Sequence, residues 1–150
     1  MAINFSPKVG QILECNYGEY TLSADGRTVK DVNYHIPPEM IKNRLVVVLN
    51  GKLNKNSCIV VPLSTTHDLQ KTLRGIHVEI PGEDIPEFIY FRQQVRWAKA
   101  DMIQQVSTER LNRPRTNRGH AQVQLSHLVV GNIQKAVIKA INGSSLFIQS

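Results

Sequence analysis

Two apolar runs decide the fold: Arg44-Leu45-Val46-Val47-Val48-Leu49 and, after a polar stretch, Ser57-Cys58-Ile59-Val60-Val61-Pro62-Leu63. Both runs are short and rich in β-branched residues, which is typical of strands that are buried on both faces. The polar residues 50–56 between them predict a hairpin loop longer than a two-residue turn. The order strand, loop, strand therefore predicts an antiparallel pair.

Segments on both sides of this pair also show strand character. Residues 10–17 alternate loosely and are rich in strand-forming side chains, and residues 75–80 alternate between apolar and polar side chains. Residues 95–102 alternate again, which predicts that Val95 and Trp97 point inward, with Trp97 in the core. The polar residues of that segment would then reach solvent or a groove.

The C-terminal part of the chain changes to a helical period. Between Leu125 and Ile141, apolar residues recur at intervals of three and four, which predicts one amphipathic helix. Ser126 is placed to cap its N-terminus, and Asn142-Gly143 to end it. Several short antiparallel strands followed by one helix predict a mainly β fold, either a small antiparallel β-barrel or a curled antiparallel sheet with a C-terminal α-helix packed against it, formed by residues 1–150 as a single domain.

Charge is distributed unevenly along the chain. Its 150 residues carry 18 Lys and Arg against 12 Asp and Glu, a formal net charge of +6. Residues 91–120 hold seven basic and two acidic side chains, a net charge of +5. This cluster favours a polyanionic partner, because Lys and Arg displace counterions from phosphates, although a solvated basic loop has the same composition.

Long apolar segments are missing from the sequence. No stretch approaches the ~18 apolar residues of a membrane-spanning helix. The first ten residues show no basic start followed by an apolar run, so no signal peptide is expected. We therefore expect a cytoplasmic protein with no membrane partner.

Residue types that bind metals or cofactors form no recognisable site. Cys15 and Cys58 lie within apolar runs and are interpreted as buried free thiols in a reducing cytosol. The acidic residues of 79–87 are interpreted as a solvated loop. Four histidines are interpreted as surface or turn residues: His67, His77, His120 and His127. No metal ion and no cofactor is therefore expected.

Polar side chains at the ends of the apolar strands could carry out acid–base chemistry on a phosphodiester. Glu39 lies five residues before Arg44, which opens one strand, and Ser64, Thr65 and Thr66 follow the other. Such chemistry needs a base for the attacking oxygen, an acid for the leaving oxygen and a cation for the charge on the phosphorane. From the residues alone, a surface ion pair and strand-end turns are the more common interpretation.

The stretch PPEMIKNRLVVVLNGKLNKNSCIVVPLSTT, residues 37–66, resembles the MazF/PemK family of toxin endoribonucleases from bacterial type II toxin–antitoxin pairs. That family opens with a G-x-I/V strand, here residues 10–12. It continues with a loop glutamate five residues before an arginine, a hairpin, and a V-P-[LVC]-[ST]-[ST] element. A later strand ends in a basic-x-Asp element, here Lys99 and Asp101. The resemblance covers about residues 8–142.

The resemblance implies an SH3-like curled barrel, usually a homodimer, and metal-independent cleavage of single-stranded RNA at short sequence motifs. In that reaction the ribose 2′-OH attacks the adjacent phosphate and leaves a 2′,3′-cyclic phosphate and a 5′-OH. By position, the resemblance implies four catalytic residues: Arg44, Ser64, Thr65 and Glu39. We expect five further residues to contact RNA: Lys99, Asp101, Arg96, Lys42 and Thr66.

Three positions depart from the family pattern, one of them Leu45, which replaces the more usual proline after Arg44. Lys99 stands where the PemK branch has an arginine, and a lysine lacks the bidentate geometry that suits phosphate. That branch also has a histidine directly before its loop glutamate, where this chain has Pro38. His35 lies three residues upstream of Pro38 and does not simply inherit that role.

The resemblance also implies a cognate antitoxin, whose acidic disordered tail would bind the same basic groove as RNA. Recognition of RNA bases is expected in the loops of residues 18–43 and 50–56. Two other function classes stay open. One is a toxin of the same fold that inhibits DNA gyrase without cutting RNA, and the other is an inactive module that binds nucleic acid or a partner.

Overall fold

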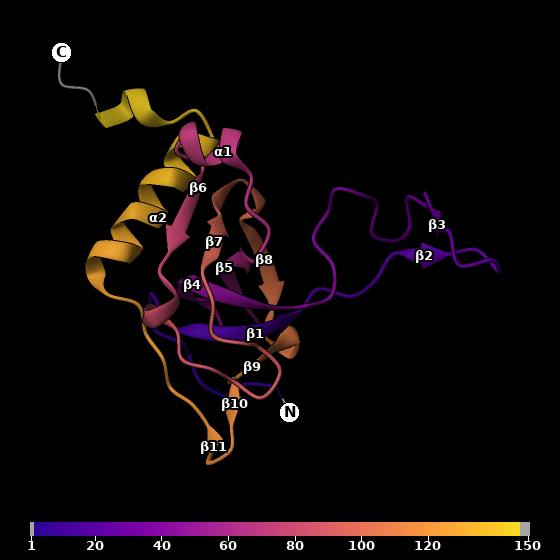
Figure 1. Ribbon diagram of the computed structural model, residues 1–150, viewed down its shortest axis with the longest axis horizontal. Helices are drawn as coiled ribbons and strands as arrows, with labels where there is room; N and C mark the ends of the chain where they lie inside the picture. The colour runs from indigo at the N-terminus through magenta and orange to yellow at the C-terminus, as the bar shows by residue number, and fades with distance from the viewer. Residues whose placement is uncertain (1, 148–150) are drawn as a thin grey trace.

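The structure is a computed structural model that describes residues 2–147. A curled antiparallel sheet carries one long helix, and an extended arm projects away from both (Figure 1). The strands and helices follow in this order: β1 (Ile12–Asn16), β2 (Thr21–Leu22), β3 (Thr28–Val29), β4 (Asn43–Asn54), β5 (Ser57–Ser64), α1 (Leu69–Leu73), β6 (His77–Ile80), η1 (Gly82–Asp84), β7 (Arg96–Lys99), η2 (Ala100–Met102), β8 (Gln104–Ser107), η3 (Thr108–Arg110), β9 (Leu111–Asn112), β10 (Arg115–Thr116), β11 (Gly119–His120), α2 (His127–Ala140) and η4 (Ser144–Phe147).

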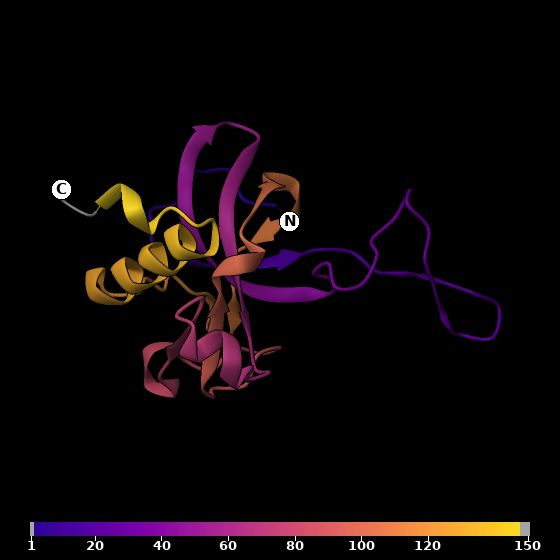
Figure 2. The ribbon, with the colours of Figure 1, turned by 90° about the horizontal axis from the view of Figure 1, so that it is seen from above.

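The β4–β5 hairpin forms the middle of the sheet and confirms the predicted antiparallel pair. The strands lie in the order β6-β7-β5-β4-β1-β9, and β8 is a second partner of β5. The first half of β5 pairs with β8, whereas its last residues, Leu63 and Ser64, pair with Ala98 and Trp97 of β7. Because two strands share the edge of β5 that faces away from β4, the sheet curls (Figure 2).

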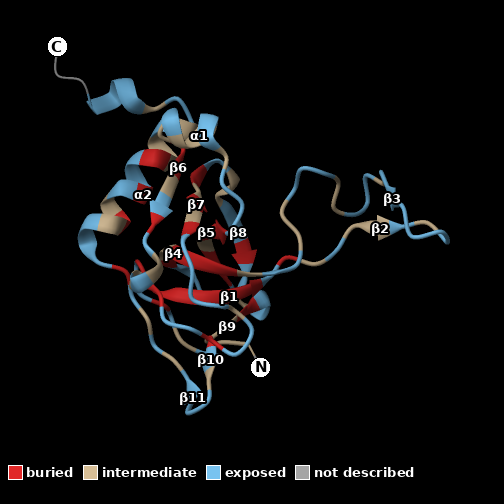
Figure 3. Ribbon diagram, viewed as in Figure 1, coloured by how far each residue is buried: buried red, intermediate tan, exposed pale blue. Residues whose placement is uncertain are grey.

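Apolar side chains from the two faces of β1 and β4 fill two cores. Figure 3 shows that most of the ribbon of β1 and the first part of β4 is buried. One core lies on the side of α2 and includes the fully buried Ile12, Val47 and Ile133. The other includes Leu13 and Val46 and is covered by the N-terminal segment. Neighbouring residues of one strand thus enter opposite cores, as expected for strands that are buried on both faces.

Helix α2 confirms the predicted C-terminal helix. Its N-cap is Ser126, whose Oγ accepts a hydrogen bond from the backbone N–H of Val129 at 3.3 Å. It ends before Asn142, which adopts a left-handed conformation with φ of 60°. The predicted fold class, a mainly β antiparallel structure with one C-terminal helix, is therefore confirmed. In the described part of the chain, no helix is both long and apolar enough to span a membrane.

The arm consists of residues 18–43, between β1 and β4, and carries the small β2–β3 ladder (Figures 1 and 2). Its two ends are held together at the body of the molecule. The N–H of Lys42 donates to the carbonyl of Gly18 at 2.6 Å, and the N–H of Tyr17 donates to the carbonyl of Lys42 at 2.9 Å. The residues that follow the arm therefore enter β4 from a fixed point.

The predicted polar loop at residues 50–56 is wrong in its extent. Strand β4 continues to Asn54, and the chain turns only at residues 55–56. Gly51 is buried in this extension, where the backbone of Pro7 crosses too closely to leave room for a side chain. The N-terminal segment thus covers this part of the hairpin.

The predicted orientation of residues 95–102 is also wrong. Arg96 is only 5% exposed and Ala98 is fully buried, whereas Val95 is exposed and Trp97 half-buried. The pairing of Ala98 with the buried Leu63 determines which side chains of β7 point inward, because residues opposite each other on neighbouring strands point to the same face. Trp97 points the other way and stacks on His67 with ring centroids 4.5 Å apart.

The prediction for the two cysteines is confirmed. Cys15 and Cys58 are buried free thiols. Burial raises the pKa of the Cys15 thiol to about 12 and also raises the pKa of Cys58. Both thiols are therefore protonated at neutral pH and act as small apolar core side chains.

Candidate active site

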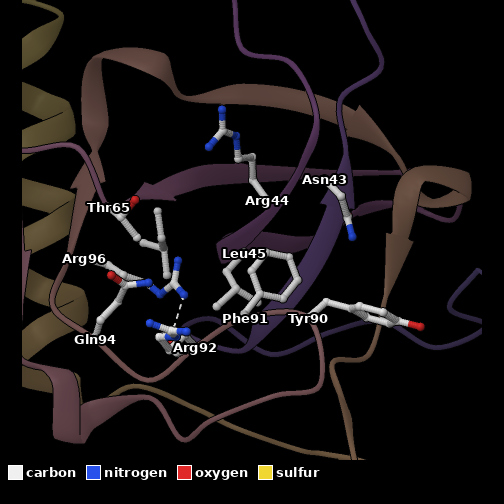
Figure 4. A pocket seen from close by; sticks show the side chains of 10 residues that line it. Asn43, Arg44, Leu45, Thr65, Tyr90, Phe91, Arg92, Gln94 and Arg96 are labelled. Atoms are coloured by element: carbon white, nitrogen blue, oxygen red, sulfur yellow. Dashed lines mark hydrogen bonds between the residues drawn. The ribbon is translucent and has the colours of Figure 1, made fainter.

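A cleft of about 390 Å³, which we call the arginine cleft, lies beside the start of β4 and the end of β5. Three arginines and a threonine surround its apolar centre (Figure 4): Arg44, Arg92, Arg96, Thr65, Leu45 and Phe91. None of the described residues that line it is acidic. Three guanidinium groups with no neighbouring carboxylate make this cleft a site for an anion with several acceptor oxygens.

A tight turn before β4 sets the direction of Arg44. Lys42 adopts a left-handed conformation with φ of 72°, which is uncommon for a residue with a side chain. The Nε of Arg44 then donates a hydrogen bond to the carbonyl of Ile41 at 3.0 Å. The terminal nitrogens of the guanidinium remain available for a ligand. Lys42 itself is exposed at the turn and does not line the cleft.

Arg96 enters the cleft because of the orientation of β7. Its Nη2 donates to the carbonyl of Arg92 at 2.9 Å, and its guanidinium carbon lies 5.7 Å from the ring centre of Phe91. Burial lowers the pKa of Arg96 from its ordinary value, but an arginine in a protein keeps its charge. Arg96 is therefore a fixed positive charge, and Arg92 beside it is an exposed one.

The three hydroxyl residues after β5 take different positions. Ser64 is buried, and its Oγ accepts the N–H of Thr66 at 3.0 Å, which turns the chain at the end of the strand. Thr65 is thereby exposed toward the arginine cleft and lines it. Ser64 and Thr66 are not among its lining residues.

A second cleft of about 430 Å³, which we call the carboxylate cleft, lies beside the end of the arm, where Pro38, Glu39 and Met40 line it. Its polar lining comes from the arm, α1, the segment after β7 and the start of β8: His35, Glu39, Lys71, Asp101 and Gln104. One carboxylate oxygen of Glu39 accepts the N–H of Ile36 at 2.6 Å. The Nδ1 of His35 lies 3.9 Å from the same oxygen. The Glu39 side chain is 59% exposed, so its other oxygen faces the cleft and solvent.

Asp101 is held on both of its oxygens. The Nζ of Lys71 lies 2.7 Å from one oxygen, and the Nε2 of His77 lies 2.8 Å from the other. Because an ionised carboxylate only accepts hydrogen bonds, Nε2 carries the proton of His77. Burial raises the pKa of Asp101, but the hydrogen bonds from Lys71 and His77 outweigh it and hold that pKa below its ordinary value.

The structure thus divides the expected site residues between two clefts. Arg44, Thr65 and Arg96 line the arginine cleft, and Glu39 and Asp101 line the carboxylate cleft. No hydrogen bond or ion pair joins Glu39 to Arg44 among the described residues. Four expected residues line neither cleft: Ser64, Thr66, Lys42 and Lys99.

Three residues in or directly behind these clefts did not follow from the sequence patterns: Arg92, Lys71 and His77. Arg92 belongs to the basic segment, which marked it only as one charge among seven. Lys71 lies in the short helix α1, for which no periodicity was visible. His77, interpreted as a surface or turn residue, is only 3% exposed, and that interpretation is wrong because β6 faces inward at this position.

Metal-binding side chains are not clustered in either cleft. Within residues 2–147, no three His, Cys, Asp or Glu side chains come together in a way that could hold a metal ion. The chemistry that the clefts offer from this chain is therefore that of guanidinium, ammonium, imidazole, carboxylate and hydroxyl groups.

Two curated bacterial proteins are similar to this chain over nearly its full length. The uncharacterized protein YifN of Escherichia coli K12 is 61% identical over 147 residues, which cover 97% of this chain and 99% of YifN. An uncharacterized protein of Haemophilus influenzae is 44% identical over 142 residues, which cover 93% of each chain.

Solved structures of low sequence identity share the fold. An endoribonuclease from a mycobacterial species has a TM-score of 0.53 at 13% identity, with 92% of this chain and 93% of that chain covered. The Mycobacterium tuberculosis toxin MazF-mt6 has a TM-score of 0.50 at 17% identity, with 69% and 91% covered. An endoribonuclease in complex with its cognate antitoxin, also mycobacterial, has a TM-score of 0.51 at 14% identity, with 91% and 95% covered.

The match to a family model covers most of the chain, including the second part of the arm, the hairpin and both clefts. The model is that of the PemK-like, MazF-like toxins of type II toxin–antitoxin systems, and it matches residues 28–141. The curled sheet, the C-terminal helix and the polar strand ends agree with this match. The chain therefore belongs to the PemK-like, MazF-like family of type II toxins.

Proposed function

We propose that this protein is an endoribonuclease toxin that cuts single-stranded RNA through attack of a ribose 2′-OH on the adjacent phosphate. The products would carry a 2′,3′-cyclic phosphate and a 5′-OH. The observation that carries the proposal is the meeting of Arg44, Arg92 and Arg96 with Thr65 in one cleft without a carboxylate. The 13% and 14% identical neighbours named as endoribonucleases share only the fold with this chain, so the activity rests on the cleft.

The arginine cleft would bind the scissile phosphate. Arg44 and Arg96 donate to its non-bridging oxygens, and the Thr65 hydroxyl fixes its orientation. As the 2′-oxygen attacks, negative charge grows on those oxygens, and guanidinium groups already in place stabilise it without rearrangement. Arg44 is half-buried and Arg96 is buried, so the local dielectric constant is lower than in water. The attraction between the guanidinium groups and the developing charge is therefore stronger.

Glu39 is the carboxylate that would take the proton of the 2′-OH, and the departing 5′-oxygen would take a proton from solvent to give the 5′-OH. A base needs a free oxygen within reach of its proton, and one oxygen of Glu39 accepts no hydrogen bond from the described residues. Asp101 is a weaker candidate, since Lys71 and His77 occupy both of its oxygens and lower its pKa. Met40 lines the carboxylate cleft and Asn43 lines the arginine cleft, and the three Cα–Cα steps of about 3.8 Å between them keep their Cα atoms within about 11 Å of each other.

The partners follow from the family and the charge distribution. We propose a cognate antitoxin with an acidic segment that competes with RNA for the arginine cleft, as type II systems pair toxin with antitoxin. We further propose that residues 1–150 act as one domain, that the toxin is a homodimer, and that it works in the bacterial cytoplasm.

The test is incubation of the purified protein, free of antitoxin, with a long single-stranded RNA in EDTA. We expect discrete fragments with cyclic phosphate ends. Arg44→Ala should lower the rate by about 100-fold or more, the effect of removing one fixed donor from a developing oxyanion. Lys135→Ala, a charge change on the exposed face of α2 outside both clefts, should leave the rate unchanged.

Two results would contradict the proposal. One is the absence of fragments from the wild-type protein at any concentration. The other is growth arrest on expression that Arg44→Ala does not relieve, which would favour a toxin that acts by binding a protein such as DNA gyrase. Thermal unfolding of Arg44→Ala shows whether the variant is folded.

A further inference from the structure

The two clefts differ in chemistry, and this difference carries an inference that rests on the proposed function. The arginine cleft presents three cations and no described acid. The carboxylate cleft presents two carboxylates, Glu39 and Asp101, against one ammonium, that of Lys71. A second phosphate would be repelled there, so the carboxylate cleft suits an uncharged part of the RNA.

The walls of the carboxylate cleft suit the flat face of a nucleobase. Pro38, Met40, Met102 and Ile103 provide apolar surface on several sides. The imidazole of His35 adds an aromatic ring, and bases splayed out of single-stranded RNA commonly stack on histidine and other aromatic side chains. Methionine thioethers also make favourable contacts with aromatic rings.

The polar edge of this cleft is fixed in place. The ammonium of Lys71 and a carboxylate oxygen of Asp101 lie side by side, 2.7 Å apart. Asp101 is in turn held by His77, which is 3% exposed and belongs to β6. The Lys71 ammonium is a donor and the Asp101 carboxylate an acceptor, and together they match an adjacent acceptor and donor on one edge of a base. Because the buried His77 holds Asp101 in place, Lys71 and Asp101 cannot readily rearrange to bind a base edge with a different pattern.

We propose that the carboxylate cleft is a recognition pocket for one RNA base near the scissile phosphate, and that Lys71 with Asp101 determines which base it accepts. In this pocket Lys71 donates to a ring or carbonyl acceptor of the base, and the remaining lone pairs of Asp101 accept from a base N–H. His35 and the apolar walls hold the faces of the ring. His77 acts through Asp101 and does not touch the base.

The test compares cleavage of a library of RNAs with randomised sequence by the wild-type protein and by Lys71→Met. A residue that contacts a base changes the preference at one position, whereas a residue that contacts phosphate weakens cleavage of all sequences together. We expect Lys71→Met to lose about 10-fold or more of the discrimination at one position of the cleavage motif and to keep the others. Lys135→Met, which removes a charge from the exposed face of α2 outside both clefts, should leave the whole motif unchanged.

A second measurement separates this inference from the proposed function. Binding of 2′-deoxy oligonucleotides, which lack the attacking hydroxyl, reports base preference without cleavage. A uniform loss across all sequences in Lys71→Met, with a weaker salt dependence of binding, would identify a phosphate contact and overturn the inference while the nuclease stands. Failure of the wild type to cut RNA would overturn the proposed function. A binding preference for one base that Lys71→Met removes would still support the pocket.

Discussion

Two partly buried carboxylates have pKa values shifted in opposite directions. Burial alone would raise the pKa of Asp101. The hydrogen bonds from Lys71 and His77 lower this pKa by more than burial raises it, so the pKa lies below its ordinary value. Folding therefore gains stability from this group above about pH 4, and loses it as the pH falls through the folded-state pKa. We expect Asp101→Asn to lower the free energy of unfolding by about 1–3 kcal/mol at pH 7 and by little at pH 3, measured by urea denaturation.

Glu14 on β1 provides the opposite case for the same experiment. Its carboxyl is buried, one oxygen has no hydrogen-bond partner among the described residues, and burial raises its pKa. Its folded-state pKa lies above the unfolded-state value, so stability is lost as the pH rises through the folded-state pKa. Glu14→Gln should therefore stabilise the protein at pH 7 and not at pH 3. Equal effects of either variant at both pH values would show that these carboxylates do not titrate as described.

At the scale of elements, the sequence predicts where a strand lies better than it predicts which side chains of that strand point inward. The alternation in residues 95–102 correctly indicates β7, yet it suggests that Trp97 points inward. Arg96 can take the inner position because its guanidinium lies over the ring of Phe91, donates to the carbonyl of Arg92 and lines the cleft. The pairing of Ala98 with Leu63 determines which side chains of β7 point inward. This pairing joins segments that are far apart in the chain, so the local sequence pattern does not predict it.

The contact between the N-terminal segment and β4 gives a prediction at the same scale. A Cβ on Gly51 would overlap the carbonyl oxygen of Pro7, which belongs to the backbone and cannot rotate away. We expect Gly51→Ala to lower the free energy of unfolding by about 1–3 kcal/mol, the usual cost of overpacking, as measured by chemical denaturation. Gly26→Ala is not a matched control because its φ is positive, whereas Gly131→Ala in α2 meets no atom within 4 Å and should not destabilise. A stable Gly51→Ala would mean that the N-terminal segment does not lie across β4.

At the scale of the whole molecule, the candidate site joins segments that are far apart in the chain. Arg44 and Thr65 flank the hairpin, so their proximity follows from the antiparallel pair that the sequence predicts. Arg92 and Arg96 reach them only because β7 pairs with the end of β5. The cluster of Lys71, His77 and Asp101 needs α1, β6 and the segment after β7 to meet, which no spacing in the sequence indicates.

The same arrangement explains how the uneven charge of the chain is used, and it can be measured. Residues 91–120 hold most of the net charge of +6, and two of their arginines, Arg92 and Arg96, join Arg44 in one cleft. Each phosphate neutralised on a single strand contributes about −0.7 to the slope of log K against log salt. Arg44 and Arg96 on the scissile phosphate and Arg92 on a second phosphate would therefore give a slope of about −1.4. Binding of a 2′-deoxy oligonucleotide at several salt concentrations should show a slope near that value. Arg92→Gln, an exposed change, should reduce the slope by about 0.7, whereas Lys135→Gln on the exposed face of α2 should not. An unchanged slope in Arg92→Gln would show that Arg92 does not contact an RNA phosphate. The basic residues of 91–120 would then be interpreted as a solvated charged surface.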